Sequence, residues 1–253
     1  MRKIVHKVVH ALGFEAFRLQ RSYEQTLTLH LVEHSDQVMH FLVDNPHDAV
    51  QKHHANGKLY EPEECALIDR YFQGGVFVDV GANVGNHSVF FGKLQKTDLV
   101  IAFEPNPLIH PILCANIEYN GLSEKFKLYR LALSDGEGEI SLHIPAQNMG
   151  AASFSGIRDG RKTERTVKAH RAMGDAIIEK TKIDFLKIDV EGHEVECING
   201  LKDTILANRP PIFIEVSPKD RTVLEALLAS LGYVLQAEYS RYDTSTNLLL
   251  THG

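Results

Sequence analysis

Cysteine is scarce in this sequence, and the few residues present form no close pair. The chain of 253 residues has three, Cys65, Cys114 and Cys197, and no Cys-x-x-Cys motif. An odd number of widely spaced cysteines argues against a disulfide framework and favours reduced thiols in a cytoplasmic protein. Long apolar runs are also lacking. None approaches the roughly 20 residues that span a bilayer, so we expect no membrane helix.

An excess of positive charge is absent as well. Lys and Arg total 27 against 33 Asp and Glu, which leaves a net charge of −6. A mildly acidic chain lacks the field that attracts nucleic acid or anionic lipid, so we expect neither as a partner. With 43% hydrophobic and 24% charged residues, the composition is that of a globular domain. This excludes a disordered, collagen-like or coiled-coil chain.

The beginning of the chain differs in pattern from the rest. In residues 1–17, apolar residues are interrupted by His and Lys, which favours an amphipathic helix over a signal peptide. Residues 26–33 and 37–44 alternate apolar and polar side chains around a short turn, which predicts a β-hairpin.

A second helix is predicted before the main part of the chain. It begins at Glu61-Pro62-Glu63-Glu64, where a proline in the first turn and several acids suit a helix start, and it ends at Phe72. We expect residues 1–70 to form an extension that packs on the domain formed by residues 71–253.

From residue 76 onward, short apolar strands alternate with amphipathic helices. We predict strands at residues 76–80, 99–104, 126–132, 185–189, 212–216, 233–238 and 248–251. We predict helices at residues 85–94, 108–120, 192–208 and 220–231. Such strands indicate a mostly parallel seven-stranded α/β sheet with helices on both faces. The gap before the last strand is too short for a crossover helix, so that strand should run antiparallel.

One stretch interrupts this alternation. Residues 139–144 and 166–170 have the pattern of an additional strand pair. The polar segment 145–164 between them is rich in small residues and long for a loop. We therefore expect it to be a mobile lid over the site.

The sharpest local signal is a glycine-containing turn after the first strand of this pattern. In FVDVGANVGNHS, residues 77–88, a strand ends at Val80 and a helix opens near Gly85. Gly81 and Gly85 let the backbone approach a ligand, so we expect a nucleotide-like cofactor at this helix start. The NAD fingerprint Gly-x-Gly-x-x-Gly is not met, because Asn83 stands in place of its second glycine. A turn without a ligand is the alternative.

The next two strand ends carry polar side chains that suit a nucleoside. Glu104 ends the second strand at the spacing expected of an acid that binds ribose hydroxyls. Ser134 and Asp135 end the third strand, where an adenine would lie. An exposed glutamate and an ordinary Ser-Asp-Gly turn are the alternatives.

Titratable residues gather at the ends of the fourth and fifth strands. Asp189 ends the fourth strand, Glu191 and His193 follow it, and Glu215 lies near the end of the fifth. Lys187 precedes Asp189 by two residues and so shares its face. Because adjacent parallel strands end at one edge, these groups should act as a base or bind a divalent cation. We favour Asp189 as a base without metal. An acid that only caps the next helix is the alternative.

Taken together and in this order, the motifs resemble the FkbM family of S-adenosylmethionine-dependent methyltransferases. The residues that carry the resemblance are FVDVGANVGNHS, AFEPNP, ALSDGEGEISL, DFLKIDVEGHE, INGL and PPIFIEV. The resemblance covers residues 71–217 and implies a Rossmann-like class I methyltransferase fold with S-adenosylmethionine as cofactor. The cofactor-binding residues that it implies are Asp79, Gly81, Asn83, Gly85, Asn86, Glu104, Ser134 and Asp135.

The activity implied by the resemblance is O-methylation of a small molecule or a sugar. The candidate catalytic residues are Lys187, Asp189, Glu191, His193 and Glu215, and no metal site is expected. An NAD-dependent oxidoreductase is the main alternative, because it shares the strand–turn–helix and the ribose acid. A cofactor-binding scaffold without turnover is another. Neither the methyl acceptor nor the oligomeric state follows from the sequence.

Overall fold

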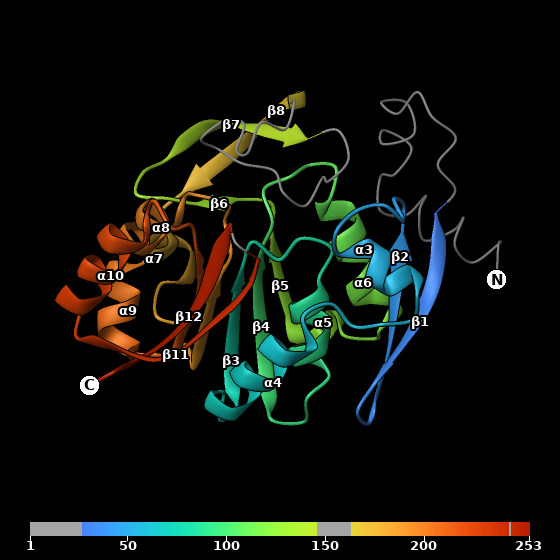
Figure 1. The fold of residues 1–253 in the computed structure, drawn as a ribbon, viewed down its shortest axis with the longest axis horizontal. Coiled ribbons are helices and arrows are strands. Elements are labelled where there is room, and N and C mark those ends of the chain that lie inside the picture. Colours follow the sequence, from blue (N-terminus) through green and yellow to red (C-terminus); the bar gives the residue numbers. More distant parts are fainter. Residues whose placement is uncertain (1–26, 146–162, 243) are drawn as a thin grey trace.

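The computed structural model describes residues 27–145, 163–242 and 244–253, and its main feature is a seven-stranded sheet (Figure 1). The strand order is β11-β12-β10-β9-β3-β4-β5. These strands are β3 (Gly75–Val80), β4 (Thr97–Phe103), β5 (Phe126–Tyr129), β9 (Phe185–Ile188), β10 (Ile212–Val216), β11 (Tyr233–Tyr242) and β12 (Ser245–His252). The pairs from β10 to β5 are parallel, and β12 is antiparallel to both its neighbours. The predicted sheet is therefore confirmed.

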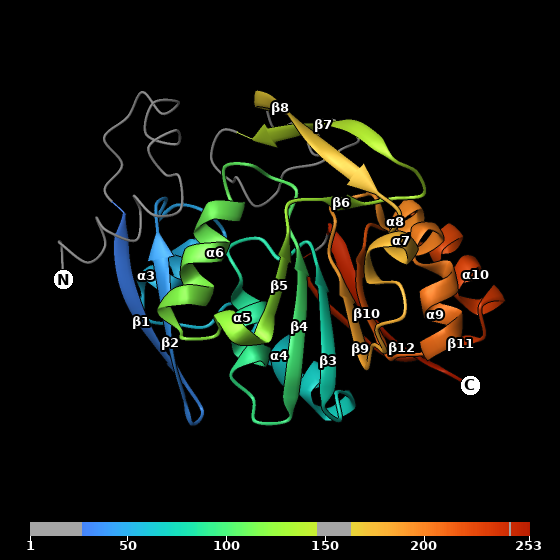
Figure 2. The same cartoon turned by 180° about the vertical axis from the view of Figure 1, so that it is seen from behind.

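Helices cover both faces of this sheet (Figures 1 and 2). The helices of one face are α4 (Pro62–Tyr71), α5 (Asn86–Gly92) and α6 (His110–Tyr119), with the short α3 (Gln51–Ala55) nearby. Those of the other face are α7 (Gly174–Ile178), α8 (Glu194–Gly200), α9 (Lys202–Asn208) and α10 (Arg221–Ser230). Of the helices in the described part of the chain, none is long and apolar enough to cross a membrane.

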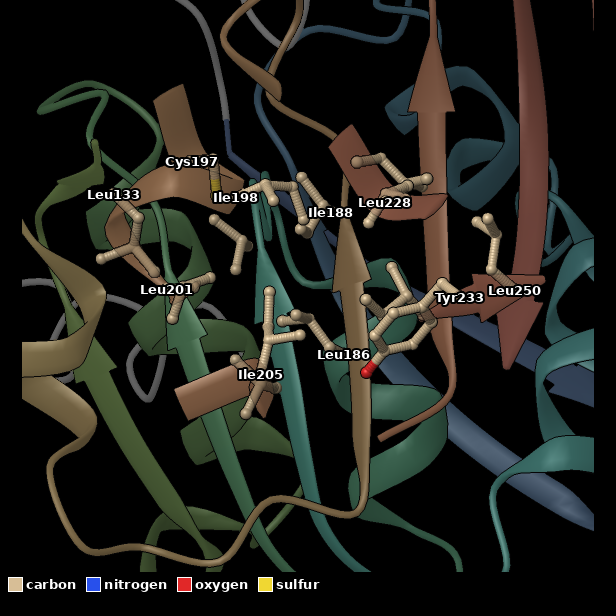
Figure 3. Packing of buried hydrophobic residues seen from close by; sticks show 14 of the residues in the cluster. Leu133, Leu186, Ile188, Cys197, Ile198, Leu201, Ile205, Leu228, Tyr233 and Leu250 are labelled. Carbon is tan, nitrogen blue, oxygen red and sulfur yellow. The ribbon is translucent and has the colours of Figure 1, made fainter. Parts of the chain in front are cut away.

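Alternation of side chains along the strands gives the sheet two buried faces. Val78, Leu186 and Ile188 belong to the core under α7–α10, whereas Phe77 and Phe185 belong to the core under α4–α6. Figure 3 shows the first of these cores, in which Leu186 and Ile188 lie against side chains of α8, α9 and α10. Odd-numbered residues on β3 and β9 therefore face α4 and α5. The polar residues Asp79 and Lys187, which are also odd-numbered, point to this same face.

The prediction of one strand over residues 126–132 is wrong in its second half. After β5 the chain leaves the main sheet, and Ala132–Leu133 (β6) pair with β8 (Thr163–Ala172) instead. β6, β8 and β7 (Gly138–Pro145) form a three-stranded sheet beyond the end of β5 (Figure 2). Leu133 is buried in the core under α7–α10, and this burial explains why the chain turns aside. The predicted extra strand pair is confirmed as the antiparallel β7 and β8.

The single helix predicted over residues 192–208 is two helices, α8 and α9. A Cβ at Gly200 would lie 1.9 Å from the carbonyl oxygen of Ser134, so the chain passes very close to the β6 segment here. The Asp175 carboxylate accepts two backbone N–H groups at the start of α9, at 2.8 and 3.1 Å, and so caps that helix. The five-residue helices α3 and α7 are not predicted, because they are too short to show a helical period.

The predicted hairpin is confirmed as β1 (Thr28–His34) and β2 (Gln37–Val43), which pair antiparallel. Its Met39 and Phe41 side chains belong to the same core as Phe77 of the main sheet. The backbone N–H of Leu42 donates to Oδ1 of Asn116 on α6 at 2.7 Å. Core packing and hydrogen bonding therefore both join the hairpin to the rest of the structure.

Some predictions concern parts of the chain that the structure does not describe. The helix predicted at residues 1–17 lies outside the described residues, as does most of the lid predicted at residues 145–164. The domain boundary at residue 70 stays a prediction.

The aromatic centre under α4 and α5 gives a stability prediction. Phe77 stacks on Phe91 at 4.3 Å and on Phe185 at 5.5 Å between ring centroids, and it is fully buried. We expect Phe77→Ala to lower the free energy of unfolding by about 3–5 kcal/mol, because it removes a large buried side chain and leaves a cavity. Denaturant unfolding measures the loss.

The matched control is Val223→Ala on α10, where the side chain is 59% exposed. That variant should stay within about 0.5 kcal/mol of the parent. Equal losses in the two variants would contradict the assignment of Phe77 to the core.

Candidate active site

The glycine-containing turn joins β3 to α5 and packs directly on the end of β9. Gly81, Asn83 and Gly85 all have positive φ, at 81°, 52° and 91°. A Cβ at Gly81 would lie 1.8 Å from the carbonyl oxygen of Asp189. The fold itself therefore requires a glycine at position 81. The same close approach brings the glycine-containing turn against the end of β9.

Glu104 follows β4 and binds the glycine-containing turn through one carboxylate oxygen and its own loop through the other. Oε2 accepts the backbone N–H of Asn83 and Oε1 that of Asn106, each at 2.8 Å. Burial raises the pKa of Glu104 to about 7, although these two hydrogen bonds favour the charged form. The predicted ribose acid therefore also holds the turn in shape. Each oxygen keeps a second lone pair for a ligand hydroxyl.

Asn86 uses its side chain to hold the segment that precedes α4. Its Oδ1 is 2.9 Å from Nε2 of His54 and accepts the backbone N–H of Tyr60 at 3.1 Å. Its Nδ2 donates to the carbonyl oxygen of Tyr60 at 2.8 Å. The predicted contact of Asn86 with a cofactor stays a prediction. In the structure, this side chain links the predicted extension to the first turn of α5.

A buried ion pair lies at the ends of β3 and β9. Asp79 and Lys187 are register partners on adjacent strands, and their side-chain atoms Oδ1 and Nζ are 3.1 Å apart. Ser88 Oγ donates to the other oxygen of Asp79 at 2.7 Å. Lys187 Nζ is also 3.7 Å from Oδ2 of Asp189. Burial alone would lower the pKa of Lys187, but the two carboxylates raise it above its usual value, so the lysine stays charged.

Asp189 and Glu215 meet at this edge, as the sequence predicts. Ile188 and Ile214 are register partners on the parallel strands β9 and β10, which places the two following acids side by side. Burial raises the pKa of Asp189. Burial also raises the pKa of Glu215 well above its usual value, and the charges of Asp189 and Glu191 raise it further. Two adjacent carboxyl groups of this kind do not both ionise easily, so they can share protons.

His193 lies on the other side of the candidate site, against Ser134. The ring Nε2 of His193 is 3.0 Å from Oγ of Ser134, and Nδ1 is 3.6 Å from a carboxylate oxygen of Glu196. Burial lowers the pKa of His193. Arg171 of β8 donates to Oγ of Ser134 at 3.4 Å and lies 3.7 Å from Asp135. The predicted adenine-binding pair and the predicted titrating histidine are thus one hydrogen-bonded group.

Two side chains near the ion pair are not among the predicted site residues. Glu61, at the start of α4, and His87, in the first turn of α5, are both buried, and their Oε2 and Nε2 atoms are 3.7 Å apart. The charges of Asp189 and Lys187 both act on Glu61. The sequence shows Glu61 only as one of several acids at a helix start, and no local pattern indicates that it points inward.

A metal site is not evident where the acids gather. Within the described ranges, no three metal-ligating side chains come together in a way that could hold an ion.

Comparison with known proteins identifies relatives among methyltransferases. A model of the methyltransferase FkbM domain matches residues 79–235, more than half of the chain. The hexuronic acid methyltransferase AglP of Haloferax volcanii is 29% identical over 164 residues, which are 62% of this chain and 64% of the relative. The methyltransferase sdnD of Sordaria araneosa is 26% identical over 220 residues, 75% of this chain and 85% of that protein.

A third relative and a solved structure complete the comparison. The 2-O-methyltransferase NoeI of Sinorhizobium fredii is 26% identical over 171 residues, 60% of this chain and 67% of that protein. The crystal structure of a methyltransferase FkbM from Methylobacillus flagellatus superposes with a TM-score of 0.51 at 17% identity, over 70% of this chain and 43% of that one. That likeness shows the shared Rossmann-like fold. The motif resemblance is therefore confirmed, and the chain belongs to the FkbM methyltransferase family.

Proposed function

We propose that this protein transfers a methyl group from S-adenosylmethionine to a hydroxyl group of a small, sugar-like molecule. Membership of a methyltransferase family provides the reaction class. The observation that carries the proposal is the placement of Glu104 on the glycine-containing turn, next to the strand end where Lys187 and Asp189 meet. Glu104, as the acid for the ribose, and the Lys187–Asp189 pair, as the polar centre for methyl transfer, then lie along one edge of the sheet.

The charges at this edge suit the cofactor. Glu61, Asp79 and Asp189 lie near Lys187, so acids outnumber the lysine that the structure places among them. S-adenosylmethionine bears a sulfonium and an ammonium group, and a surplus of carboxylates attracts both. In this proposal Gly81, Asn83 and Gly85 bracket the methionine part, Glu104 holds the ribose, and Ser134 and Asp135 flank the adenine.

S-adenosylmethionine supplies a methyl group that is already activated by the positive sulfur. The work left to the protein is to align the acceptor oxygen and to accommodate its proton. We assign the alignment to Asp189, whose carboxylate can accept a hydrogen bond from the acceptor hydroxyl. Lys187, 3.7 Å away, favours the charged form of that carboxylate against the effect of burial. Glu191 and Glu215, whose charges interact with that of Asp189, are further groups for the proton, and His193 beside Ser134 is another.

We infer a neutral acceptor rather than an acidic one. One relative is a hexuronic acid methyltransferase and another is a 2-O-methyltransferase. In this chain the acids Asp189, Glu191 and Glu215 influence one another, and they would repel a carboxylate on the acceptor. A neutral sugar hydroxyl meets no such repulsion.

The competing functions are less well supported. An NAD-dependent oxidoreductase would share the strand–turn–helix, but family membership assigns this domain to methyltransferases. A scaffold without turnover is separated from an enzyme by assay. We keep the cytoplasm as the proposed location, because Cys65, Cys114 and Cys197 are all free thiols.

A substrate panel tests the proposed activity. The purified protein is incubated with methyl-labelled S-adenosylmethionine and, separately, with the methyl glycosides of fucose, glucose and glucuronic acid. We expect label to appear in a methyl ether of a neutral glycoside, with slower or no transfer to the glucuronide. Mass spectrometry identifies the product. Preferred methylation of the glucuronide would contradict the inferred acceptor class.

Cofactor binding should depend on Glu104. Glu104→Gln removes the charge and places an amide N–H₂ against a backbone N–H donor, and each charge-assisted hydrogen bond is worth about 1.5–3 kcal/mol. We expect affinity for S-adenosylmethionine, measured by calorimetry, to fall at least about tenfold. Since the pKa of Glu104 is about 7, parental affinity should rise with pH through about 7 as the carboxylate forms.

The control for this variant is Glu124→Gln, at an exposed position on the short helix Ser123–Lys125. It should bind the cofactor like the parent. Parental affinity in Glu104→Gln would show that the ribose assignment is wrong.

Turnover should depend on Asp189, and a chelator should leave it unchanged. We expect Asp189→Asn to lower the turnover of a glycoside substrate by about 100-fold through loss of alignment, with cofactor affinity retained. The exposed Asp203→Asn serves as the control. Loss of activity with EDTA and its return with magnesium would instead support an acid-bound cation. Parental turnover in Asp189→Asn would remove Asp189 from the site.

A further inference from the structure

The residue that begins α4 is held in an unusual conformation and points inward. Glu61 has φ 54° and ψ 53°, the left-handed region, which residues other than glycine rarely adopt. The following Pro62 disfavours a right-handed helical conformation at this position. The side chain of Asn86 fixes the preceding Tyr60, because it accepts the backbone N–H of Tyr60 and donates to its carbonyl oxygen. The strained turn is thus set by its surroundings, and it leaves Glu61 only 6% exposed.

The side chain of Glu61 meets groups from four elements. The titratable or charged residues that face it are Tyr60, Glu64, Cys65, His87, Lys187, Asp189 and Glu215. The Tyr60 side chain hydrogen-bonds the Glu61 carboxylate. Nε2 of His87 lies 3.7 Å from Oε2 of Glu61, is sealed from solvent and has no hydrogen-bond partner. Glu61 is therefore built into the polar centre between α4, α5, β9 and β10.

Glu61 and Asp189 lie in different electrostatic surroundings. Asp189 has the Lys187 ammonium at 3.7 Å, whereas the Glu61 carboxylate lies 3.7 Å from the imidazole of His87. Burial lowers the pKa of His87 to about 3, so this ring is neutral near pH 7. Burial, together with the charges of Asp189 and Glu64, raises the pKa of Glu61 to about 7. Asp189 thus lies against a cation and Glu61 against a neutral ring, so the two acids are suited to two different roles.

We propose that Glu61 is the residue that takes the proton of the acceptor hydroxyl, and that His87 positions it. This inference rests on the methyl transfer proposed above. The acceptor oxygen forms its bond to the methyl carbon, the carbon–sulfur bond breaks with its electron pair going to sulfur, and the hydroxyl proton passes to the Glu61 carboxylate. Neutral His87 can then accept a hydrogen bond from the protonated acid through its unpartnered Nε2. Asp189, with Lys187 beside it, keeps the acceptor aligned.

This role places a reactive group outside the domain that defines the family. The family model begins at residue 79, and Glu61 lies before it. The segment that carries Glu61 is held to the domain by Asn86, which lies inside the matched region. The site is therefore completed by the part of the chain that precedes the family domain, and variation in that part would change the chemistry of the site.

Proton release on cofactor binding tests whether Glu61 lies at the transfer centre. A sulfonium within about 6 Å favours the ionised carboxylate, so binding of S-adenosylmethionine at pH 7 should expel a proton from Glu61. S-adenosylhomocysteine has a neutral sulfur and the same ribose, so effects of Glu104 cancel between the two ligands. Calorimetry in two buffers of different ionisation enthalpy counts the protons. We expect more release with S-adenosylmethionine than with S-adenosylhomocysteine.

Two variants of α4 decide the result. Glu61→Gln should lower the difference between the two ligands by the share that Glu61 contributes, whereas Glu63→Gln, an exposed acid on the same helix, should retain the full difference. A difference that is unchanged in Glu61→Gln, or that is absent in the parent, would overturn the proposal. Failure of the parent to bind either ligand would instead overturn the proposed function. Glu61→Asp retains the carboxylate and should retain part of the difference if Glu61→Gln does not fold.

The pH profile gives a second readout that a purely structural role would not produce. With the glycoside that turns over in the substrate panel, parental kcat should rise with pH, because Glu61 must be ionised to accept a proton. The rise should lie below the pKa of about 7 that Glu61 has without ligand, because the bound sulfonium favours the ionised carboxylate. Glu61→Gln should lower kcat by about 100-fold and remove this rise, and Glu61→Asp should restore part of both. An unchanged profile in Glu61→Gln would assign the proton to another group.

Discussion

The buried pair of Asp79 and Lys187 is the interaction on which the candidate site depends. The two side chains are register partners on β3 and β9, and both are withdrawn from solvent. Removing one partner of such a pair leaves an uncompensated buried charge, at a cost of about 3–5 kcal/mol. The pair requires β3 and β9 to end at the same level of the sheet. It therefore fixes the glycine-containing turn after β3 beside the acidic residues that follow β9. Lys187 also lies 3.7 Å from the carboxylate of Asp189 and donates a hydrogen bond to the carbonyl oxygen of Gly81 at 3.5 Å.

The same pair explains why the predicted extension bears on the chemistry. Odd-numbered residues of β3 and β9 face α4 and α5, so the aromatic core of Phe77 and Phe185 continues directly into the polar groups Asp79 and Lys187. Any residue that covers the Asp79–Lys187 end of the sheet face under α4 and α5 therefore becomes part of the site. Glu61 and His87 do so, one from each helix. The aromatic layer excludes water beneath the charges and strengthens every interaction among them.

Much of the architecture could be predicted because its signals are local. Apolar strands, helical periods and a glycine turn after the first strand identify a parallel α/β domain, and a short last connection identifies its antiparallel strand. The departures have contacts from distant segments as their cause. The predicted third strand splits because Leu133 packs under the helices of the opposite face. The predicted long helix breaks because Gly200 meets the backbone of Ser134 and Asp175 caps a new helix.

The sequence by itself determined the family, the sheet and the meeting of Asp189 with Glu215 and Lys187, since residues at the ends of parallel strands share an edge whatever the loops do. Only the tertiary structure decided how the remaining groups combine. Ser134 and His193 are 59 positions apart and share a hydrogen bond, and Asn86 binds Tyr60 across 26 positions. Glu61 turns inward through a left-handed backbone conformation, which the neighbouring residue types do not predict. These contacts are set by how layers pack, and layer packing depends on the whole chain rather than on a local period.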